Sequence, residues 1–209
     1  MSYGPSDFGS VLQGVGSWAN AIAIGFAAVW GAKTFKNWQK QKITEKRMAH
    51  AERILVATFK FRNALNYVRS GPNAAELRVA LAELGHLSGE PSEHLYRQAV
   101  SICYKKRLDQ TWGDQVAFHD CIPMAVALFG LPMNEPMQEL SDQFRRLHFY
   151  VEAHSLRREL HTPEFEQEIQ FAMHFGKSPG QTNEMDDKVE ACIAKIVETC
   201  SAALKYPEG

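Results

Sequence analysis

Histidines are the side chains of this chain best suited to act as bases or metal ligands, and three of the eight cluster in the sequence. His148, His154 and His161 lie on one predicted helix or at its end. A structural zinc site takes four protein ligands and a catalytic one takes three. No other element supplies an identifiable further ligand, and the chain has no HExxH motif. We therefore predict no metal site and no cofactor, only surface pairing at four-residue spacing, namely His148 with Glu152 and His154 with Arg158.

The cysteines are spread over the chain, as Cys103, Cys121, Cys192 and Cys200. They form neither a CxxC pair nor a compact disulfide framework, so we predict reduced, mostly buried thiols in a cytosolic compartment. His119 and Asp120 precede Cys121, but neighbouring residues of a helix point in different directions. The chain also lacks a GxSxG nucleophile elbow and a glycine-rich phosphate loop. No catalytic residue is predicted.

One class of helical bundle that cuts RNA, the HEPN class, uses an Arg followed by a His after four to six residues. Arg62 is followed by Asn63, as in the start of that motif, yet no His follows at the required distance. The Arg146–His154 spacing is too long, and the spacing from Arg157 to the next His is too short. The formal net charge of −1 also argues against a dedicated nucleic-acid binder. A degenerate HEPN-like bundle is kept as an alternative, and no specific nucleic-acid partner is expected.

The segment Phe8–Ala32 contains 25 residues and no charge, and it determines where the rest of the chain is placed. At about 1.5 Å per residue, about 20 residues span the roughly 30 Å hydrocarbon core of a bilayer. Basic residues follow the segment, not precede it, which disfavours a signal peptide and predicts a cytoplasmic C-terminal part. We predict a single-pass protein of the bacterial inner membrane, with residues 1–33 as the N-terminal segment and transmembrane helix and 34–209 as the cytosolic domain. The alternative is a helix buried in a large soluble assembly, because Gln13 and Asn20 interrupt the apolar run.

Two sets of side chains in and below this segment are candidate binding residues. Small residues recur every four positions beside one asparagine, a pattern that favours close helix packing in lipid. The predicted interface between copies is Ala19, Asn20, Ala23, Ala27 and Gly31. Lysines and tryptophans then flank the predicted inner surface of the bilayer. The predicted headgroup contacts are Trp30, Lys33, Lys36, Trp38 and Lys40. The alternatives are that small residues are simply common in spans and that the lysines only set topology.

The remaining chain predicts an all-α fold, a transmembrane helix that continues into a cytosolic helical bundle, because no alternating strand pattern occurs. Apolar residues in heptad-like spacing mark the buried faces of two long helices. The first face is Ile54, Thr58, Phe61, Leu65 and Val68, and the second is Met137, Leu140, Phe144, Leu147 and Val151. We expect Pro123 to kink or divide a helix. Residues 130–136 are predicted to be a loop in which Asn134 caps the next helix. The expected helices are 34–70, 74–87, one containing 95–103, 114–129, 135–160, one starting near 163, and 184–204.

Two stretches carry a family resemblance: KTFKNWQKQKITEKRMAHAERILVATFKFRNALNYVRS, after the anchor, and DDKVEACIAKIVETCSAAL, near the C-terminus. They resemble a widespread group of uncharacterised bacterial membrane proteins, which implies a single anchor and a cytosolic helical domain. The layout is also similar to that of membrane accessory proteins of CRISPR-type antiviral systems, which are oligomeric and perturb the membrane. We therefore expect a self-associating stress or antiviral-defence effector that perturbs the membrane. The alternatives are a tether that recruits a cytosolic partner and a HEPN-like RNA-binding protein or RNase.

Overall fold

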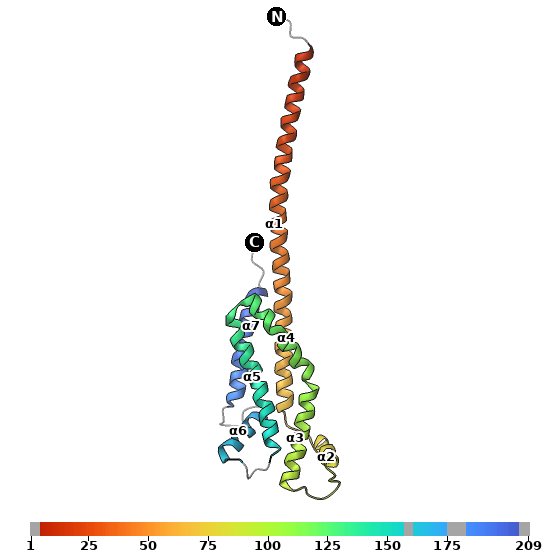
Figure 1. The fold of residues 1–209 in the computed structure, drawn as a ribbon, viewed down its shortest axis with the longest axis vertical. Helices are drawn as coiled ribbons and strands as arrows, with labels where there is room; N and C mark the ends of the chain where they lie inside the picture. The colour runs from red at the N-terminus through yellow and green to blue at the C-terminus, as the bar shows by residue number, and fades with distance from the viewer. Residues whose placement is uncertain (1–4, 157–160, 175–182, 205–209) are drawn as a thin grey trace. The chain divides into compact units, whose positions relative to one another are not determined.

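The computed structural model describes the backbone of residues 5–156, 161–174 and 183–204, and the side chains from residue 25 onward within those ranges. These residues form helices, with no strand among them, so the predicted all-α class is confirmed. Figure 1 labels the helices in chain order: α1 Pro5–Arg69, α2 Ala74–Glu83, α3 Glu93–Gln110, α4 Trp112–Phe129, α5 Leu131–His154, α6 Pro163–Met173 and α7 Glu184–Leu204.

Helix α1 contributes to two compact units, Met1–Arg47 and Met48–Gly209. Most of the predicted span, residues 8–24, lies outside the residues whose side chains are described. Within the described part of the chain, no helix combines the length and the apolar character needed to cross a bilayer. The domain boundary expected between residues 33 and 34 is the point where the helix is predicted to leave the membrane, and it stays a prediction.

In the second unit, the final turns of α1 form one wall of the core, as their spacing predicts. Ile54, Phe61 and Leu65 are completely buried. The ring of Phe61 stacks on Phe118 of α4, with centroids 4.3 Å apart, and meets Phe144 of α5 at 5.0 Å. Such close aromatic packing adds to the stabilisation that burial alone provides. This aromatic cluster joins α1, α4 and α5.

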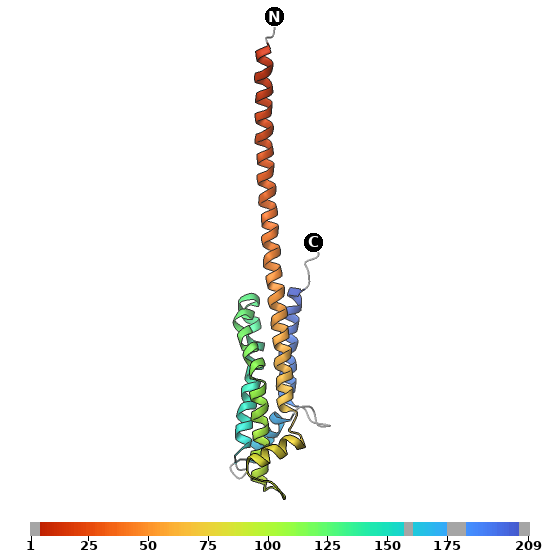
Figure 2. The same cartoon turned by 90° about the vertical axis from the view of Figure 1, so that its right-hand side faces the viewer.

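Helices α5 and α7 complete the core. The five predicted residues of the α5 face are all buried, and Val189, Ile193 and Ile196 bury one face of α7 against the same cluster. In Figures 1 and 2, both helices run beside the orange-to-yellow end of α1. The apolar periodicity of these helices therefore identified their inward faces correctly.

Helix α2 begins where the sequence predicts and ends earlier. Asn73 and Glu76 form a capping box, in which each side chain accepts a hydrogen bond from the other residue's backbone N–H. The helix was expected to reach residue 87, but it ends at Glu83 because Gly85 adopts φ +80°, the left-handed conformation that ends many helices. A small satellite core of Ala80, Ala99 and Cys103 holds α2 against α3.

The predicted loop at 130–136, with its Asn134 cap, is wrong. Gly130 adopts φ +80°, and this single residue makes the turn between α4 and α5. Helix α5 therefore begins at Leu131, with a proline in its first turn. Pro123 does not divide α4, which is continuous to Phe129. The opposite end of α5 was also misplaced, because the helix ends at His154 and not near residue 160.

Candidate functional site

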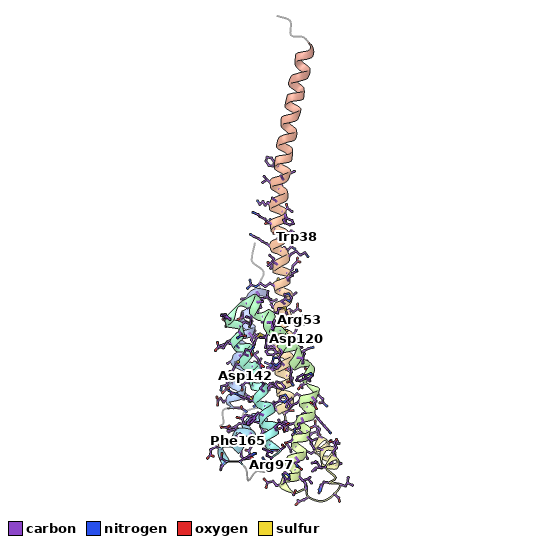
Figure 3. All side chains as sticks on the ribbon, in the orientation of Figure 1. Trp38, Arg53, Arg97, Asp120, Asp142 and Phe165 are labelled. Atoms are coloured by element: carbon purple, nitrogen blue, oxygen red, sulfur yellow. The ribbon has the colours of Figure 1, made fainter. Side chains whose placement is uncertain are left out.

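The residues predicted to contact lipid headgroups lie on the surface of α1. Trp30 is 72% exposed and Trp38 is 52% exposed, and Figure 3 labels Trp38 on this part of the helix. Phe35 stacks on Trp38 with ring centroids 5.9 Å apart and the planes inclined by 26°. Lys33, Lys36 and Lys40 are exposed as well. More than half of the surface of each of these rings is open to solvent in the described part of the chain.

The predicted interface between copies is described only in its C-terminal half. Ala27 and Gly31 are exposed, and a Cβ added at Gly31 would meet no described atom within 4 Å. Ala19, Asn20 and Ala23 lie among the residues whose side chains are not described. Small side chains at 27 and 31 thus leave room for another backbone to approach, and their role as an interface stays a prediction.

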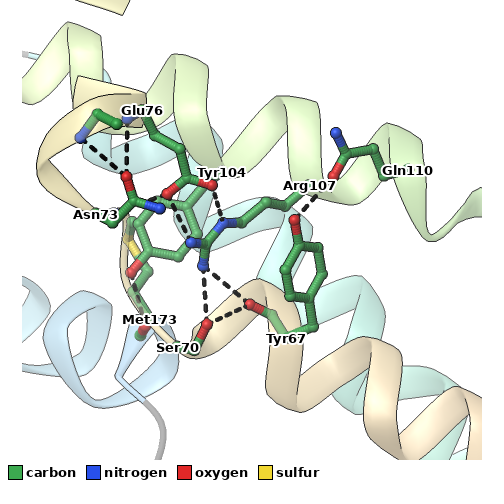
Figure 4. A network of polar contacts seen from close by, with 9 residues as sticks. Tyr67, Ser70, Asn73, Glu76, Tyr104, Arg107, Gln110 and Met173 are labelled. Atoms are coloured by element: carbon green, nitrogen blue, oxygen red, sulfur yellow. Dashed lines mark hydrogen bonds and ion pairs between the residues drawn. The ribbon is translucent and has the colours of Figure 1, made fainter. Parts of the chain in front are cut away.

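Among the described residues of the bundle, three arginines are buried that the sequence analysis did not identify, and Figure 4 shows the first, Arg107 of α3. Its Nε and Nη2 donate to the two carboxylate oxygens of Glu76, at 3.2 and 2.7 Å. Its Nη1 donates to the Tyr67 carbonyl at 3.0 Å and to Ser70 Oγ at 2.9 Å. The hydrogen bond from Arg107 lowers the pKa of Glu76 below its usual value. Arg107 therefore joins the C-terminal end of α1 and the first turn of α2 to α3.

A cavity of about 290 Å³ lies beside this network and includes Cys103, Lys106, Arg107 and Gln110 in its wall. Four of the five N–H groups of Arg107 already have acceptors, so its guanidinium has little capacity left for a ligand. Burial raises the pKa of the Cys103 thiol, which keeps it protonated and weakly nucleophilic. The cavity thus has no activated group.

The second arginine, Arg69 at the end of α1, is completely enclosed. Its guanidinium forms an ion pair with Asp186 of α7. It also donates to three carbonyl oxygens at the end of α6, which lack partners within that helix. They belong to Phe171 (3.2 Å), Ala172 (2.8 Å) and His174 (2.8 Å). A cation is favourable at a helix C-terminus, so Arg69 fastens α6 and α7 to α1.

The third arginine, Arg97 of α3, forms a bidentate ion pair with Glu166 of α6, at 3.0 and 2.8 Å. His161 Nδ1 lies 2.5 Å from the same carboxylate and donates to it. The hydrogen bond from Arg97, followed by that from His161, lowers the pKa of Glu166 to about 2. Arg97 Nε and His161 Nε2 are buried without a hydrogen-bond partner among the described residues. Glu166 is therefore a fixed anion that holds α6 on α3.

Ser101 and His154 form the pair that most resembles a nucleophile and its base. Ser101 Oγ lies 3.3 Å from His154 Nδ1 and 3.4 Å from the Val151 carbonyl oxygen. Ser101 also lines a cavity of about 560 Å³ between α3 and the end of α5. Burial, and after it the positive charge of Arg97, lowers the pKa of His154 to about 4. A general base works best with a pKa near the working pH, so the pair is poorly suited to catalysis.

A third cavity, of about 390 Å³, lies among α5, α6 and α7. Its charged walls are largely paired: Tyr150 donates to Glu168 at 3.1 Å, and Lys188 pairs with Glu184 at 2.6 Å. Tyr150 has a raised pKa because it is partly buried and donates to Glu168. None of these groups forms a nucleophile–base pair, so the cavity does not indicate a reaction.

The predicted pair of His148 with Glu152 is an electrostatic contact in the structure, while the pair of His154 with Arg158 stays a prediction. Glu152 pairs with Lys105 of α3 at 3.0 Å, and burial lowers the pKa of His148. His154 contacts α3 instead of lying on the surface, and Arg158 lies outside the described residues. Among the described residues, no group of three or more His, Cys, Asp or Glu side chains is arranged to hold a metal ion.

The cysteines are buried as predicted, and none forms a disulfide. Burial raises the pKa of the thiols of Cys121 and Cys192, and that of Cys200 reaches about 11. His119 and Asp120 are exposed while Cys121 is buried, so these neighbours do point in different directions, as expected. The thiols of the bundle are therefore structural.

No known protein family, curated protein or solved structure matches this chain. These comparisons add no support to the resemblance given above.

Proposed function

We propose that this protein is anchored in a membrane by the N-terminal half of α1 and assembles with copies of itself there. The observation that carries the proposal is the surface of α1 beyond residue 25. Large apolar side chains on this stretch are at least half exposed, namely Phe26, Val29, Trp30, Phe35, Trp38 and Ile43. Burying apolar surface is favourable by about 25 cal/mol of free energy per Å², so an exposed set of this size favours a partner outside the chain.

The distribution of charge favours a lipid surface as that partner. Residues 1–47 contain six Lys and Arg and two Asp and Glu, a net charge of +4. Residues 48–209 contain 17 and 22, a net charge of −5. The excess of positive charge is therefore confined to the part of the chain that follows the uncharged segment. Lysines mixed with aromatic residues are typical of membrane interfaces.

In this proposal the bundle lies on the cytoplasmic side of the bacterial inner membrane. Trp30, Trp38 and the nearby lysines Lys33, Lys36 and Lys40 contact headgroups, and the small residues of the anchor face other copies. The assembly acts on the bilayer itself, as a stress or antiviral effector would. A tether that recruits a cytosolic protein is the second candidate, and it predicts that the charged surface of the bundle captures a partner.

Membrane anchoring is tested by placing one charge inside the uncharged segment. Ile22→Asp should release the full chain from the membrane fraction, because an aspartate at the centre of a span costs about 3 kcal/mol. Ile43→Asp is the matched control, since Ile43 is an exposed isoleucine outside the segment. The measurement is retention of each protein in bacterial membranes after washing with alkaline carbonate. Equal retention of the two variants, or release of the unaltered protein, would show that the segment is not an anchor.

A further inference from the structure

The cavity between α3 and the end of α5 has polar groups of a single kind in its described wall. Its volume of about 560 Å³ lies in the range of sites that hold small molecules. One face of α3 supplies side chains that can each donate a hydrogen bond, namely His94, Gln98, Ser101 and Lys105. Among the described residues of the wall, none is Asp or Glu. The cavity therefore combines hydrogen-bond donors with the positive charge of Lys105.

Three of these donors have capacity for a ligand. His94 is exposed and Gln98 is partly buried, and neither side chain forms a hydrogen bond with another described residue. Lys105 Nζ lies 3.0 Å from a carboxylate oxygen of Glu152, whose side chain is 66% exposed. Such a pair in contact with solvent contributes little to stability, so a ligand can compete for the ammonium group. The wall is thus able to form new hydrogen bonds without breaking a buried contact.

Apolar side chains complete the described wall of the cavity. They come from three places in the chain, namely Leu84 after α2, Ile102 of α3 and Leu156 after α5. Leu156 is 51% exposed, and the other two are partly buried. Covering this surface removes apolar area from water, which is favourable. The wall therefore suits a molecule that has one charged end and one apolar end.

We propose that this cavity binds a small organic anion, in which a carboxylate or a phosphate monoester is joined to a short apolar body. Lys105 pairs with the anionic group, and Gln98 and His94 donate hydrogen bonds to its oxygens. Ile102 and Leu156 cover the apolar body. A cation would be repelled by Lys105, and a purely apolar ligand would bury donors without partners. The site belongs to the bundle alone and does not depend on anchoring by α1.

Binding is measured by NMR on the full chain, with isotope-labelled isoleucine methyl groups. The Ile102 methyl should shift and reach saturation, whereas that of Ile196, which is completely buried in the main core, should not shift. Hexanoate and phenyl phosphate are the two probes, and the one that binds more tightly distinguishes a lipid-derived carboxylate from a phosphorylated metabolite. Hexanol and inorganic phosphate are the controls that lack the charge or the apolar body. Each should bind about tenfold more weakly than its matched probe, or worse.

Two adjacent lysines provide a matched pair of variants. Lys105→Gln should weaken binding of the tighter probe by about tenfold, because a hydrogen bond to a charged group is lost. Lys106→Gln should leave binding unchanged. Lys106 forms a comparable exposed ion pair with Glu83, and its side chain is 48% exposed against 44% for Lys105, but it is not part of this wall. Gln98→Leu should weaken binding severalfold, since it keeps the size of the side chain and removes its donor.

The opposite results are equally defined. Absence of a saturable Ile102 shift with both probes would overturn the proposal. Hexanol that binds as tightly as hexanoate would show an apolar cavity that does not recognise charge. Equal weakening by Lys105→Gln and Lys106→Gln would show general attraction of anions to α3, and it would contradict a site in this cavity.

Discussion

The histidine at the end of α5 should make the bundle acid-sensitive between pH 6.5 and 4.5. His154 is half-buried against α3, and its pKa is lowered from 6.5 to about 4 by burial and by Arg97. Glu166 faces the same ring and acts in the opposite direction, while His174 adds to the lowering. Folding therefore favours the neutral ring, and the unfolded chain binds more protons than the folded chain in this range. Stability should fall as the pH drops from 6.5, and the loss from His154 is complete below pH 4.

The size of the effect follows from the shift. One unit of pKa corresponds to 1.36 kcal/mol, so the full shift would amount to about 3 kcal/mol. Because the ring retains some contact with solvent, we expect about 2 kcal/mol of this to be observed. The carboxyl of Glu166 does not interfere, since its stabilising contribution changes with pH only below pH 4.5, between its usual pKa and its lowered pKa of about 2. That contribution is present above pH 4.5 and is lost as the pH falls toward 2.

The measurement is urea unfolding of the purified full chain, followed by far-UV circular dichroism at several pH values between 7.5 and 4.5. His154→Gln keeps a polar side chain at this position but cannot titrate, so its unfolding free energy should lose about 2 kcal/mol less than that of the unaltered protein. His86→Gln is the control, because His86 lies in the loop after α2 and its ring bonds the nearby Gly89 carbonyl, at 3.0 Å, within the same loop. Parallel pH profiles for His154→Gln and the unaltered protein would refute the reasoning.

Three further substitutions test the packing of the bundle by the same unfolding assay. Arg69→Met should cost about 3–5 kcal/mol, because it removes the buried guanidinium that pairs with Asp186 and donates to three carbonyls at the end of α6. Exposed Arg78→Met should change stability by less than about 0.5 kcal/mol, and equal effects would contradict the role of Arg69. Phe61→Ala should cost about 3–5 kcal/mol through the cavity it leaves, well above the cost of partly exposed Phe59→Ala, and a smaller loss at 61 would place the core elsewhere. Gly130→Ala should cost about 1 kcal/mol or more because φ is +80° there, and a neutral result would show that another conformation joins α4 to α5.

Most of the buried faces could be read from the sequence because burial of apolar area repeats with the helical period. The seam from Ile54 to Val68 and the stripe from Met137 to Val151 both follow from spacing alone. The start of α5 directly after Gly130 could not be read from the sequence, because Asn134 and Pro136 are locally as good a helix start as the one used. Only the positive φ of Gly130 decides between them. Local signals compete at such points, and the tertiary structure selects among them.

The buried ion pairs were beyond prediction for a different reason. Arg97 and Glu166 are 69 residues apart in the sequence, and each alone is indistinguishable from a solvated charge on a helix surface. Arg69 gave a weak signal, since it follows Leu65 by four residues and so continues a buried face. A charged residue on an apolar face is a reason to look for a distant partner, but the sequence does not say which one.

The contact between Arg69 and Asp186 joins residues 117 positions apart, and this separation has a consequence during synthesis. At about 5–20 residues per second, the ribosome needs on the order of ten seconds to add the residues between them. Throughout that interval the apolar stripe of α1 has emerged without the helix that will cover it. Nascent chains are therefore most exposed to chaperones, proteases and premature contact with one another before α7 has been made.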